Sequence, residues 1–362
     1  MNFVDKPVSR LANQQHLNDK NDWAWRSEYW NNQSRPITAV GKSNRRKDPL
    51  MLCGHGVSMK IDAGTLFIRN GFTHHPQQRE EYRFFRGSLD IPPQILMLDG
   101  SGNISFDVLN WLTEQQVALV RIKWNGEVAS VLSGYGYAAN PHRVQWQMDT
   151  RNNPERRMAF CIDLIIRKIE GCIRTLEKAI PRSDAWEKAI SRAYADISTL
   201  ELEPPPTLEK LRIIEANSAA AYFRAWRGIP LKWRGLTKNP IPDDWKEIGS
   251  RTSDFALAGN RNASHPVNAI LNYAYAVLES QLRIKAVADG YDPTLGIMHF
   301  GGNGSSAFIF DIMEPERSKT DLEVLKFLKS NTFHPADFIL RRDGVCRLNP
   351  QLAKNIAETV SK

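Results

Sequence analysis

Residues 298–317 (MHFGGNGSSAFIFDIMEPER) collect the kinds of side chain that hold a divalent metal ion. His299 precedes a glycine-rich break, and Asp311 and Glu314 follow a short apolar run, three residues apart. Imidazole nitrogens and carboxylate oxygens are the ligands that hard and borderline divalent cations prefer. This combination predicts a metal site. The alternative interpretation is a surface helix N-terminus, where the helix dipole favours acidic residues.

A further carboxylate lies on a helix that we predict from residue 207 to about residue 226. The apolar residues of this helix form a stripe, and Glu215 falls on the same side. A carboxylate that faces a core needs an ion, a cationic partner or a raised pKa, because burying its charge alone is costly. Arg212 and Arg224 are near in sequence, so a structural ion pair is the alternative to a metal ligand.

Hydrophobic periodicity divides the chain into three regions and predicts an α+β fold. We expect an N-terminal extension at residues 1–48, a small mainly-β domain at 49–150 and a larger all-helical catalytic domain at 151–362. The extension contains several tryptophans and a basic run. We expect it to be partly ordered, with the tryptophans packed on the main body. The alternative is an arm that contacts nucleic acid by charge and stacking.

Individual elements follow from the positions of apolar runs and turn residues. The expected strands lie at residues 64–69, 95–98, 117–122 and 128–132, with one short helix at 105–114. The helices expected after Pro154 lie at approximately 158–180, 186–200, 207–226, 266–282 and 322–329. We expect the remaining tail to be short and polar.

Composition narrows the class of protein. The chain has 362 residues, of which 42% are hydrophobic and 24% charged, as is typical of a globular protein. No run approaches the roughly 20 apolar residues of a membrane span, and the N-terminus lacks the apolar block of a secretory signal, so we expect a cytoplasmic location. The four cysteines show no metal or disulfide spacing and are interpreted as buried thiols. The net charge of +8 favours a nucleic-acid partner over a membrane surface.

Three stretches in a fixed order resemble the CRISPR-associated integrase/endonuclease family, the larger of the two universal CRISPR adaptation proteins. They are residues 215–223 (EANSAAAYF), 265–275 (HPVNAILNYAY) and the 299–317 segment. Residues 111–120 (WLTEQQVALV) in the β-rich region add to the resemblance, which covers roughly residues 50–330. The order and spacing of these stretches make the combination specific.

The resemblance implies a β domain followed by a helical catalytic domain, and a set of site residues. Glu215, His299 and Asp311 would be the metal ligands, and Glu314 a neighbouring acid that assists. The metal would be magnesium or manganese. Asn268 would brace the helix packing around the site. The expected partners are double-stranded and branched DNA, a second copy of the chain in a homodimer, and the small second CRISPR adaptation protein, with no membrane.

The activity that the resemblance implies is metal-dependent phosphodiester transfer. The 3′-hydroxyl ends of foreign DNA fragments would be joined to a repeat array by transesterification, and water in place of the hydroxyl would give nuclease activity on branched DNA. Candidate contacts to the DNA backbone are Arg224, Arg227, Lys232, Arg234 and Arg261. The alternatives are a stand-alone homologue outside CRISPR, acting as a nuclease or mobile-element integrase, and a non-catalytic DNA-binding scaffold.

Two positions depart from the family pattern. Gly304 is followed by Ser305, where the family commonly has an arginine that would contact phosphate. His265 occupies the place of the aspartate that usually precedes Pro-Val-Asn. This histidine is either a second group near the metal or a structural residue at the start of a helix.

Overall fold

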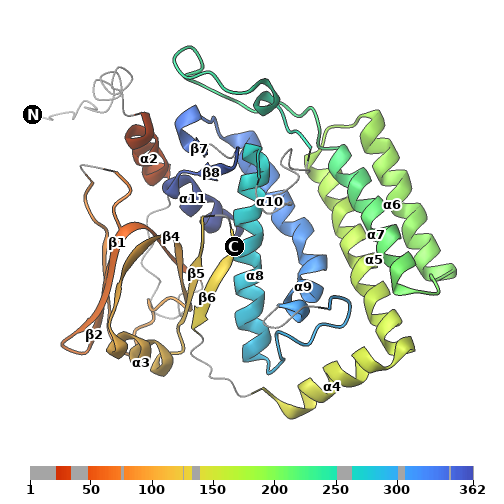
Figure 1. Cartoon of the computed structure of the whole chain (residues 1–362), viewed down its shortest axis with the longest axis horizontal. Helices are drawn as coiled ribbons and strands as arrows, with labels where there is room; N and C mark the ends of the chain where they lie inside the picture. Colours follow the sequence, from red (N-terminus) through yellow and green to blue (C-terminus); the bar gives the residue numbers. More distant parts are fainter. Residues whose placement is uncertain are drawn as a thin grey trace, which may run out of the picture.

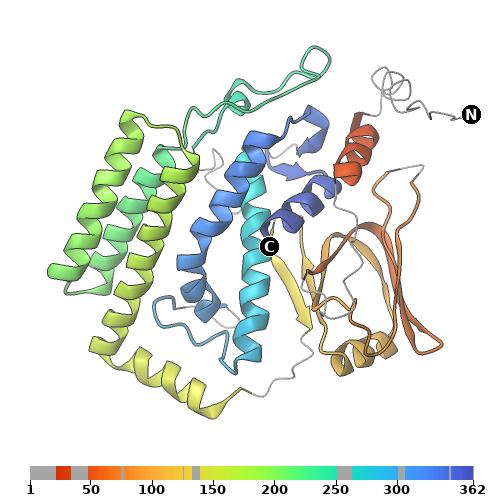
Figure 2. The same cartoon turned by 180° about the vertical axis from the view of Figure 1, so that it is seen from behind.

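The computed structural model describes residues 22–33, 48–74, 77–124, 126–132, 139–250, 263–300, 306–341 and 344–361. A mixed β-sheet lies on one side of the molecule and a group of long helices on the other (Figure 1). Helix α8 stands between the sheet and α10, and α5, α6 and α7 lie side by side beyond them (Figure 2). This arrangement confirms the predicted α+β class, with a β-rich region preceding a helical one.

The sheet has six strands in the order β3-β2-β1-β4-β5-β6. Its strands are β1 (Leu50–Asp62), β2 (Thr65–Arg69), β3 (Glu81–Phe84), β4 (Gln94–Ile104), β5 (Ala118–Ile122) and β6 (Val128–Leu132). Strand β4 is parallel to β1 and β5, and the other neighbours are antiparallel. Helix α3 (Phe106–Glu114) connects β4 to β5, as parallel strands require a crossover connection. The predicted strands and this helix are confirmed.

Both faces of the sheet are buried in its central strands. Side chains alternate along β1, so Leu50 and Leu52 face the same cluster as Trp111 of α3. Met51 and Cys53 face the opposite side, where they pack with residues of α8 (Pro266–Ala288) and α11 (Pro350–Val360). Because helices cover both faces of the sheet, consecutive residues at the start of β1 are all buried.

The helical region begins with α4 (Pro141–Asn152), followed by α5 (Pro154–Ala179), α6 (Asp184–Leu202), α7 (Leu208–Arg224), η1 (Asp243–Lys246) and α8. It continues with α9 (Ala307–Met313), η2 (Glu314–Glu316), α10 (Arg317–Ser330) and η3 (Pro335–Asp337). Side chains of Ser183 and Thr207 accept hydrogen bonds from backbone N–H groups at the starts of α6 and α7, which satisfies donors that a helix cannot satisfy itself. The predicted helices in this region are confirmed. No described helix is long and apolar enough to cross a membrane.

Two features of the helical region were not predicted. Helix α4 spans the predicted domain boundary at residue 150. The expectation of a short polar tail is wrong, because the chain after α10 forms a hairpin of β7 (Phe338–Leu340) and β8 (Cys346–Leu348) and then α11. Leu352, Ile356 and Ala357 of α11 are fully buried. Their spacing of four and one residues is that of one helix face, a signal that was present in the sequence.

Helix α2 (Asp22–Gln33) attaches the N-terminal extension to this C-terminal hairpin. The Arg26 side chain is fully buried and donates from Nε and Nη2 to the two carboxylate oxygens of Asp337, each at 2.7 Å. Trp30 is also fully buried and donates from Nε1 to Asp337 Oδ1 at 2.7 Å. The expectation that tryptophans of the extension pack on the main body is confirmed for residues 22–33.

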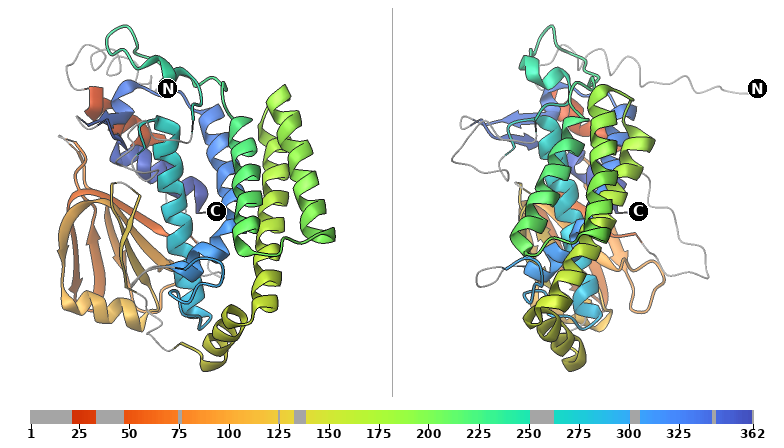
Figure 3. Two further views of the ribbon diagram at one scale, coloured as in Figure 1. Left: turned by 45° about the vertical axis from the view of Figure 1, so that its right-hand side comes forward. Right: turned by 90° about the vertical axis from the view of Figure 1, so that its right-hand side faces the viewer.

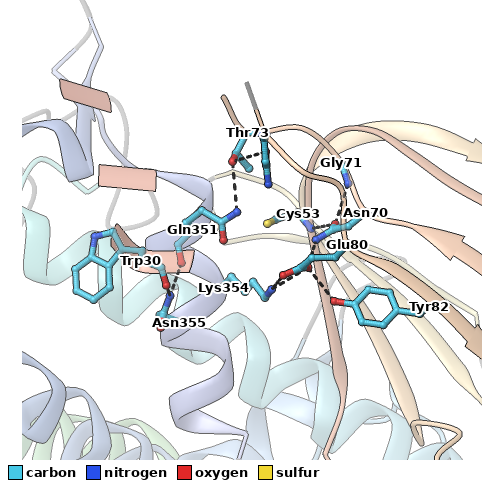
Figure 4. Close-up of polar contacts among 11 residues, drawn as sticks. Trp30, Cys53, Asn70, Gly71, Thr73, Glu80, Tyr82, Gln351, Lys354 and Asn355 are labelled. Carbon is cyan, nitrogen blue, oxygen red and sulfur yellow. Dashed lines mark hydrogen bonds and ion pairs between the residues drawn. The ribbon is translucent and has the colours of Figure 1, made fainter. Parts of the chain in front are cut away.

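Polar contacts join α11 to the sheet (Figure 4). Lys354 is 5% exposed and its ammonium donates to both carboxylate oxygens of Glu80 at 3.1 Å. Glu80 also accepts from Asn70 Nδ2 and from the Tyr82 hydroxyl, each at 2.8 Å. Burial opposes ionisation of Glu80, but Lys354 and these two donors outweigh it and hold the pKa of its carboxyl below the usual value. Glu80 is therefore an ionised group that links two regions far apart in sequence.

Removal of the Asp337 carboxylate should strongly destabilise the protein. Asp337→Ala leaves the buried Arg26 guanidinium without its charge partner, which costs about 3–5 kcal/mol for a buried pair. Urea denaturation followed by tryptophan fluorescence measures the change. Glu28→Ala, an exposed position on the same helix, is the matched control and should change the free energy of unfolding by less than about 0.5 kcal/mol. Equal stability of Asp337→Ala and wild type would contradict the contribution of α2.

Acid should weaken the contact between Glu80 and Lys354. The folded pKa of Glu80 lies below its usual value, so its stabilisation is present at neutral pH and is lost as pH falls through the folded pKa. Glu80→Gln should therefore reduce stability at neutral pH and flatten the decline of the unfolding free energy below about pH 5. Glu81→Gln, with an exposed neighbouring carboxylate, should keep the wild-type decline. Urea titrations at a series of pH values measure both.

Candidate active site

His299 lies in the connection between α8 and α9, and its imidazole forms a hydrogen-bonded pair with Asp311 of α9. His299 Nδ1 lies 2.8 Å from Asp311 Oδ1. A carboxylate without a proton only accepts, so the imidazole proton belongs on Nδ1 and the Nε2 lone pair is left for another group. Three backbone N–H groups also donate to the fully buried carboxylate: those of Ile297, Met298 and His299. Asp311 therefore fixes both the loop backbone and the orientation of the imidazole.

Glu215 and Glu314 meet at one ammonium group. Lys168 of α5 donates to Glu215 Oε1 on α7, and its Nζ lies 2.6 Å from Glu314 Oε2 on η2. The Oε2 atom of Glu314 is buried and lies within ion-pair distance of this ammonium. The Glu314 and Lys168 side chains are 6% and 13% exposed, and Glu215 is 24% exposed. Two carboxylates from separate segments therefore converge at the edge of the helical core.

Close packing between helices brings these segments together. Gly171 is one turn after Lys168, and a Cβ at this position would lie 2.0 Å from Ser318 Oγ. Only glycine permits α10 to approach α5 so closely. Thr175 then donates from its hydroxyl to the Ser318 carbonyl oxygen at 2.9 Å. Because Glu314 precedes α10 by one turn, this contact positions its carboxylate against Lys168.

Charges inside the site compensate one another. Burial opposes the charge on Glu314, yet Arg317 and then Lys168 outweigh it and lower the pKa of this carboxyl, with a smaller contribution from His299. Burial also disfavours the charged form of Lys168, but Glu314 and Glu215 raise the pKa of its ammonium. Arg317 Nη2 lies 3.4 Å from Glu314 Oε1. Glu314 is therefore held in its ionised form by two cations, Arg317 and Lys168.

The metal ligands named from the sequence, Glu215, His299 and Asp311, stay a prediction. The described residues contain no group of three or more His, Cys, Asp or Glu side chains in metal-binding geometry. Each oxygen of Asp311 accepts two hydrogen bonds, whereas Glu314 faces the Lys168 ammonium and the Arg317 guanidinium. Glu314 is therefore a further candidate carboxylate for a cation, beside the predicted ligand Asp311. The cationic partner of Glu215 is Lys168 rather than Arg212 or Arg224.

The segment that follows α7 lies at the opposite end of the helical region from α9 (Figure 3), and it carries three of the basic residues predicted to contact DNA: Arg227, Lys232 and Arg234. Arg227 donates to Ser250 Oγ, and Lys232 donates to the Lys329 carbonyl oxygen. Arg234 stacks over the rings of Trp25 and Tyr29 in α2. Arg224 is exposed, and Arg261 is outside the described residues.

Two other expected residues have structural partners. His265 caps α8: its Nδ1 accepts from the Val267 N–H, and its Nε2 lies 3.0 Å from the Glu247 carbonyl oxygen. These contacts support the structural alternative for this histidine. Asn268 donates to the Ser250 carbonyl oxygen at 2.7 Å and so braces the start of α8. The Gly304–Ser305 departure lies outside the described residues.

Sequence reasoning missed Lys168, although a signal was present. Lys168 lies among Leu164, Ile165, Ile169 and Cys172, on the apolar face of α5. A lysine within an apolar stripe needs a buried acidic partner, and the identity of that partner depends on which helices pack there. Nothing in the α5 segment alone indicates Glu215 or Glu314.

Comparison with known proteins identifies the family. A sequence model of the family described as CRISPR associated protein Cas1 matches residues 52–362. The chain is 28% identical over 256 residues to the CRISPR-associated protein Cas1 3 of Methanobrevibacter ruminantium, covering 68% of this chain and 70% of that protein. It is 26% identical to the CRISPR-associated endonuclease Cas1 1 of Archaeoglobus fulgidus, covering 71% of this chain and 73% of that protein.

Solved structures show a similar fold. A casposase bound to its integration product superposes with a TM-score of 0.67 at 22% identity, covering 87% of this chain and 82% of that chain. The Cas6-RT-Cas1–Cas2 complex superposes with a TM-score of 0.65 at 14% identity, covering 90% of this chain and 33% of that chain. At these identities the likeness concerns the fold.

The hydrogen bonds of Asp311 lead to a prediction for the metal-free protein. Asp311→Asn places an amide NH2 against N–H donors, so it should lower the free energy of unfolding by about 2–4 kcal/mol. Denaturation in the presence of a chelator measures this change. Glu215→Gln is the comparison variant. It should lower the free energy of unfolding by less, because Glu215 is partly exposed and accepts a hydrogen bond from one side chain. An unchanged stability of Asp311→Asn would contradict the positioning role.

Proposed function

The chain belongs to the Cas1 family of CRISPR-associated DNA endonucleases and integrases, and we propose that it joins the 3′-hydroxyl ends of DNA fragments to a repeat array during CRISPR adaptation. The observation that carries the proposal is the convergence of Glu215 and Glu314 on Lys168, where α5 and α7 also contact the loop of His299. Two carboxylate oxygens and one imidazole nitrogen form a donor set suited to a divalent cation. Together with the family, this set supports phosphodiester transfer.

The residues present fit a divalent metal ion. A cation, the Lys168 ammonium, already lies between the carboxylates of Glu215 and Glu314. Magnesium or manganese would be held by Glu215, Glu314 and Nε2 of His299. A bound ion would supply Lewis-acid polarisation of the scissile phosphate and stabilisation of the leaving oxygen. Asp311 is then a positioning residue for His299 rather than a ligand.

The remaining groups of the site act through charge and orientation. Asp311 holds the His299 proton on Nδ1 and so keeps Nε2 available. Lys168 and Arg317 reduce repulsion between the two glutamates. The fragment's 3′-oxygen forms a bond to the target phosphorus, and the bond from that phosphorus to the target strand's 3′-oxygen breaks. The proton of the attacking hydroxyl leaves to solvent, and the released 3′-oxygen takes up a proton from solvent. Water in place of the 3′-hydroxyl gives hydrolysis, which accounts for an endonuclease activity at the same site.

The partners follow from the family and the charge. The net charge of +8 supports binding of double-stranded and branched DNA. Of the basic residues named from the sequence, Arg224 and Arg227 are exposed and suit contacts with the DNA backbone. We include a homodimer and the small Cas2-type partner in the proposal, because a solved relative is described as a Cas1–Cas2 complex.

Substitution of the three proposed ligands should abolish the metal-dependent chemistry. Glu215→Gln, Glu314→Gln and His299→Ala should each slow strand joining and hydrolysis by at least about a hundredfold, the scale for losing one group that stabilises transition-state charge. The assay uses a fragment with free 3′ ends, a supercoiled target, the small partner protein, and added metal or chelator.

Glu316→Gln is the matched control, because Glu316 belongs to the same 3-10 turn but pairs with Lys319 at the surface. It should retain wild-type rates. Full activity of Glu314→Gln would show that a residue other than Glu314 supplies the second carboxylate ligand. Metal-dependent joining that survives all three substitutions would overturn the proposed site and favour a different catalytic centre.

A further inference from the structure

Both oxygens of the Glu314 carboxylate face a protein cation. Oε2 lies 2.6 Å from the Lys168 ammonium, and Oε1 lies 3.4 Å from Nη2 of Arg317. The same ammonium donates to Oε1 of Glu215 on α7. A carboxylate oxygen binds a metal ion and accepts a proton donor through the same lone pairs, and a metal ion repels a nearby ammonium. A divalent ion held by Glu215 and Glu314 therefore requires Lys168 to turn away from them.

Lys168, rather than Arg317, is the cation placed to compete with a metal ion. It contacts both glutamates at once, whereas the ion pair of Arg317 is with Glu314. An ammonium is a compact point charge on a flexible four-carbon stem, so it can turn away while the backbone of α5 stays in place. One positive charge between two acids from separate segments also does what a bound ion would do, because it offsets the repulsion between their carboxylates.

The surroundings of Lys168 offer little to an ammonium that has been displaced. Its side chain is 13% exposed and projects from the apolar face of α5, which contains Leu164 and Ile165. Within the described part of the chain, its ion pairs are those with Glu215 and Glu314. A buried ammonium that loses its charge partners is strongly destabilising. Entry of a metal ion into this site is therefore favourable only when another anion arrives for Lys168.

The scissile phosphate of DNA is the anion that the proposed reaction brings to this place. A metal ion that polarises a phosphate binds one of its oxygens, so the phosphate lies beside the ion that has displaced the ammonium. A lysine ammonium binds phosphate as a point charge, without the fixed geometry that a guanidinium requires. DNA can thus supply the negative charge that Lys168 loses when the metal ion takes the two glutamates.

We propose that Lys168 takes the place of the divalent ion in the metal-free protein, and that its transfer from Glu215 and Glu314 to a DNA phosphate makes metal and DNA bind cooperatively. The proposal rests on the proposed function, because it assumes that these two glutamates hold the ion. It gives Lys168 a role beyond compensation of buried charge. Without DNA the protein binds metal weakly, and the complete site forms when the phosphate is present.

Titration with Mn²⁺ tests the first part of the proposal, with the free ion measured by its electron paramagnetic resonance signal. Lys168→Gln removes the competing charge, so it should tighten Mn²⁺ binding in the absence of DNA by about fivefold to a hundredfold, the usual range of coupling between two ligands. Lys168→Met should give the same change, and its apolar side chain suits the face of α5 if the glutamine variant folds poorly. Lys178→Gln, at an exposed position of the same helix, is the matched control and should bind Mn²⁺ as the wild type does.

A second titration tests the cooperativity. It includes a branched DNA whose 3′ ends are dideoxy and therefore cannot join, and a gel confirms that the DNA stays uncut. DNA should raise the Mn²⁺ affinity of the wild type by at least about fivefold more than that of Lys168→Gln, because only the wild type gains a contact between the ammonium and a phosphate. Lys168→Arg keeps the positive charge, so it should retain both the weak binding without DNA and the larger effect of DNA.

Equal Mn²⁺ affinity of wild type, Lys168→Gln and Lys168→Met without DNA would overturn the proposal, and so would an equal effect of DNA on all three. Glu314→Gln separates this failure from a failure of the proposed function. Loss of Mn²⁺ binding in Glu314→Gln, with no tightening in the Lys168 variants, would leave the metal site in place and overturn only the role of Lys168. Wild-type Mn²⁺ binding by Glu314→Gln would overturn the metal site itself, and with it the proposal.

Discussion

The structure depends on the placement of one buried cation. Lys168 projects from the apolar face of α5, and burial of its ammonium would cost several kcal/mol without compensation. Glu215 and Glu314 supply that compensation from α7 and η2, so α5, α7 and α10 must pack in one register for the charges to meet. The same requirement brings the carboxylates of Glu215 and Glu314 to one ammonium group. The ion pairs that allow Lys168 to be buried therefore also bring the carboxylates of the candidate site together.

Asp311 and Glu314 of the Asp-Ile-Met-Glu segment contact different parts of the structure because they lie on different elements, α9 and η2. Asp311 lies within α9 and turns back to the loop at residues 297–299, where four donors saturate it. Glu314 begins the 3-10 turn and faces α5. A carboxylate saturated with hydrogen bonds holds its surroundings rigidly, whereas Glu314 contacts two cations, Lys168 and Arg317. The position of each acid relative to the end of α9 decides which groups it contacts.

Long-range polar contacts tie the regions into one unit. The buried pair of Arg26 and Asp337 joins the N-terminal extension to the C-terminal hairpin. The contact of Lys354 with Glu80 joins the last helix to the sheet. Helices α8 and α11 cover one face of that sheet, so the β-rich region is attached to the catalytic region by both apolar and ionic contacts. Such attachment holds surfaces of the two regions in a defined relation for DNA.

The sequence by itself determined the fold class, most strands and helices, and Glu215, His299, Asp311 and Glu314 as the residues of interest, because periodicity and residue chemistry are local properties. The prediction of a short polar tail missed helix α11, although the spacing of its buried residues is that of one helix face. Only the tertiary structure decided that Lys168 is the partner of Glu215, that Asp311 accepts from His299, and that Arg151 and Arg157 lie over Phe300. These contacts join segments up to roughly 150 residues apart. Side-chain roles at that separation depend on which helices pack together, and that packing is a property of the whole chain.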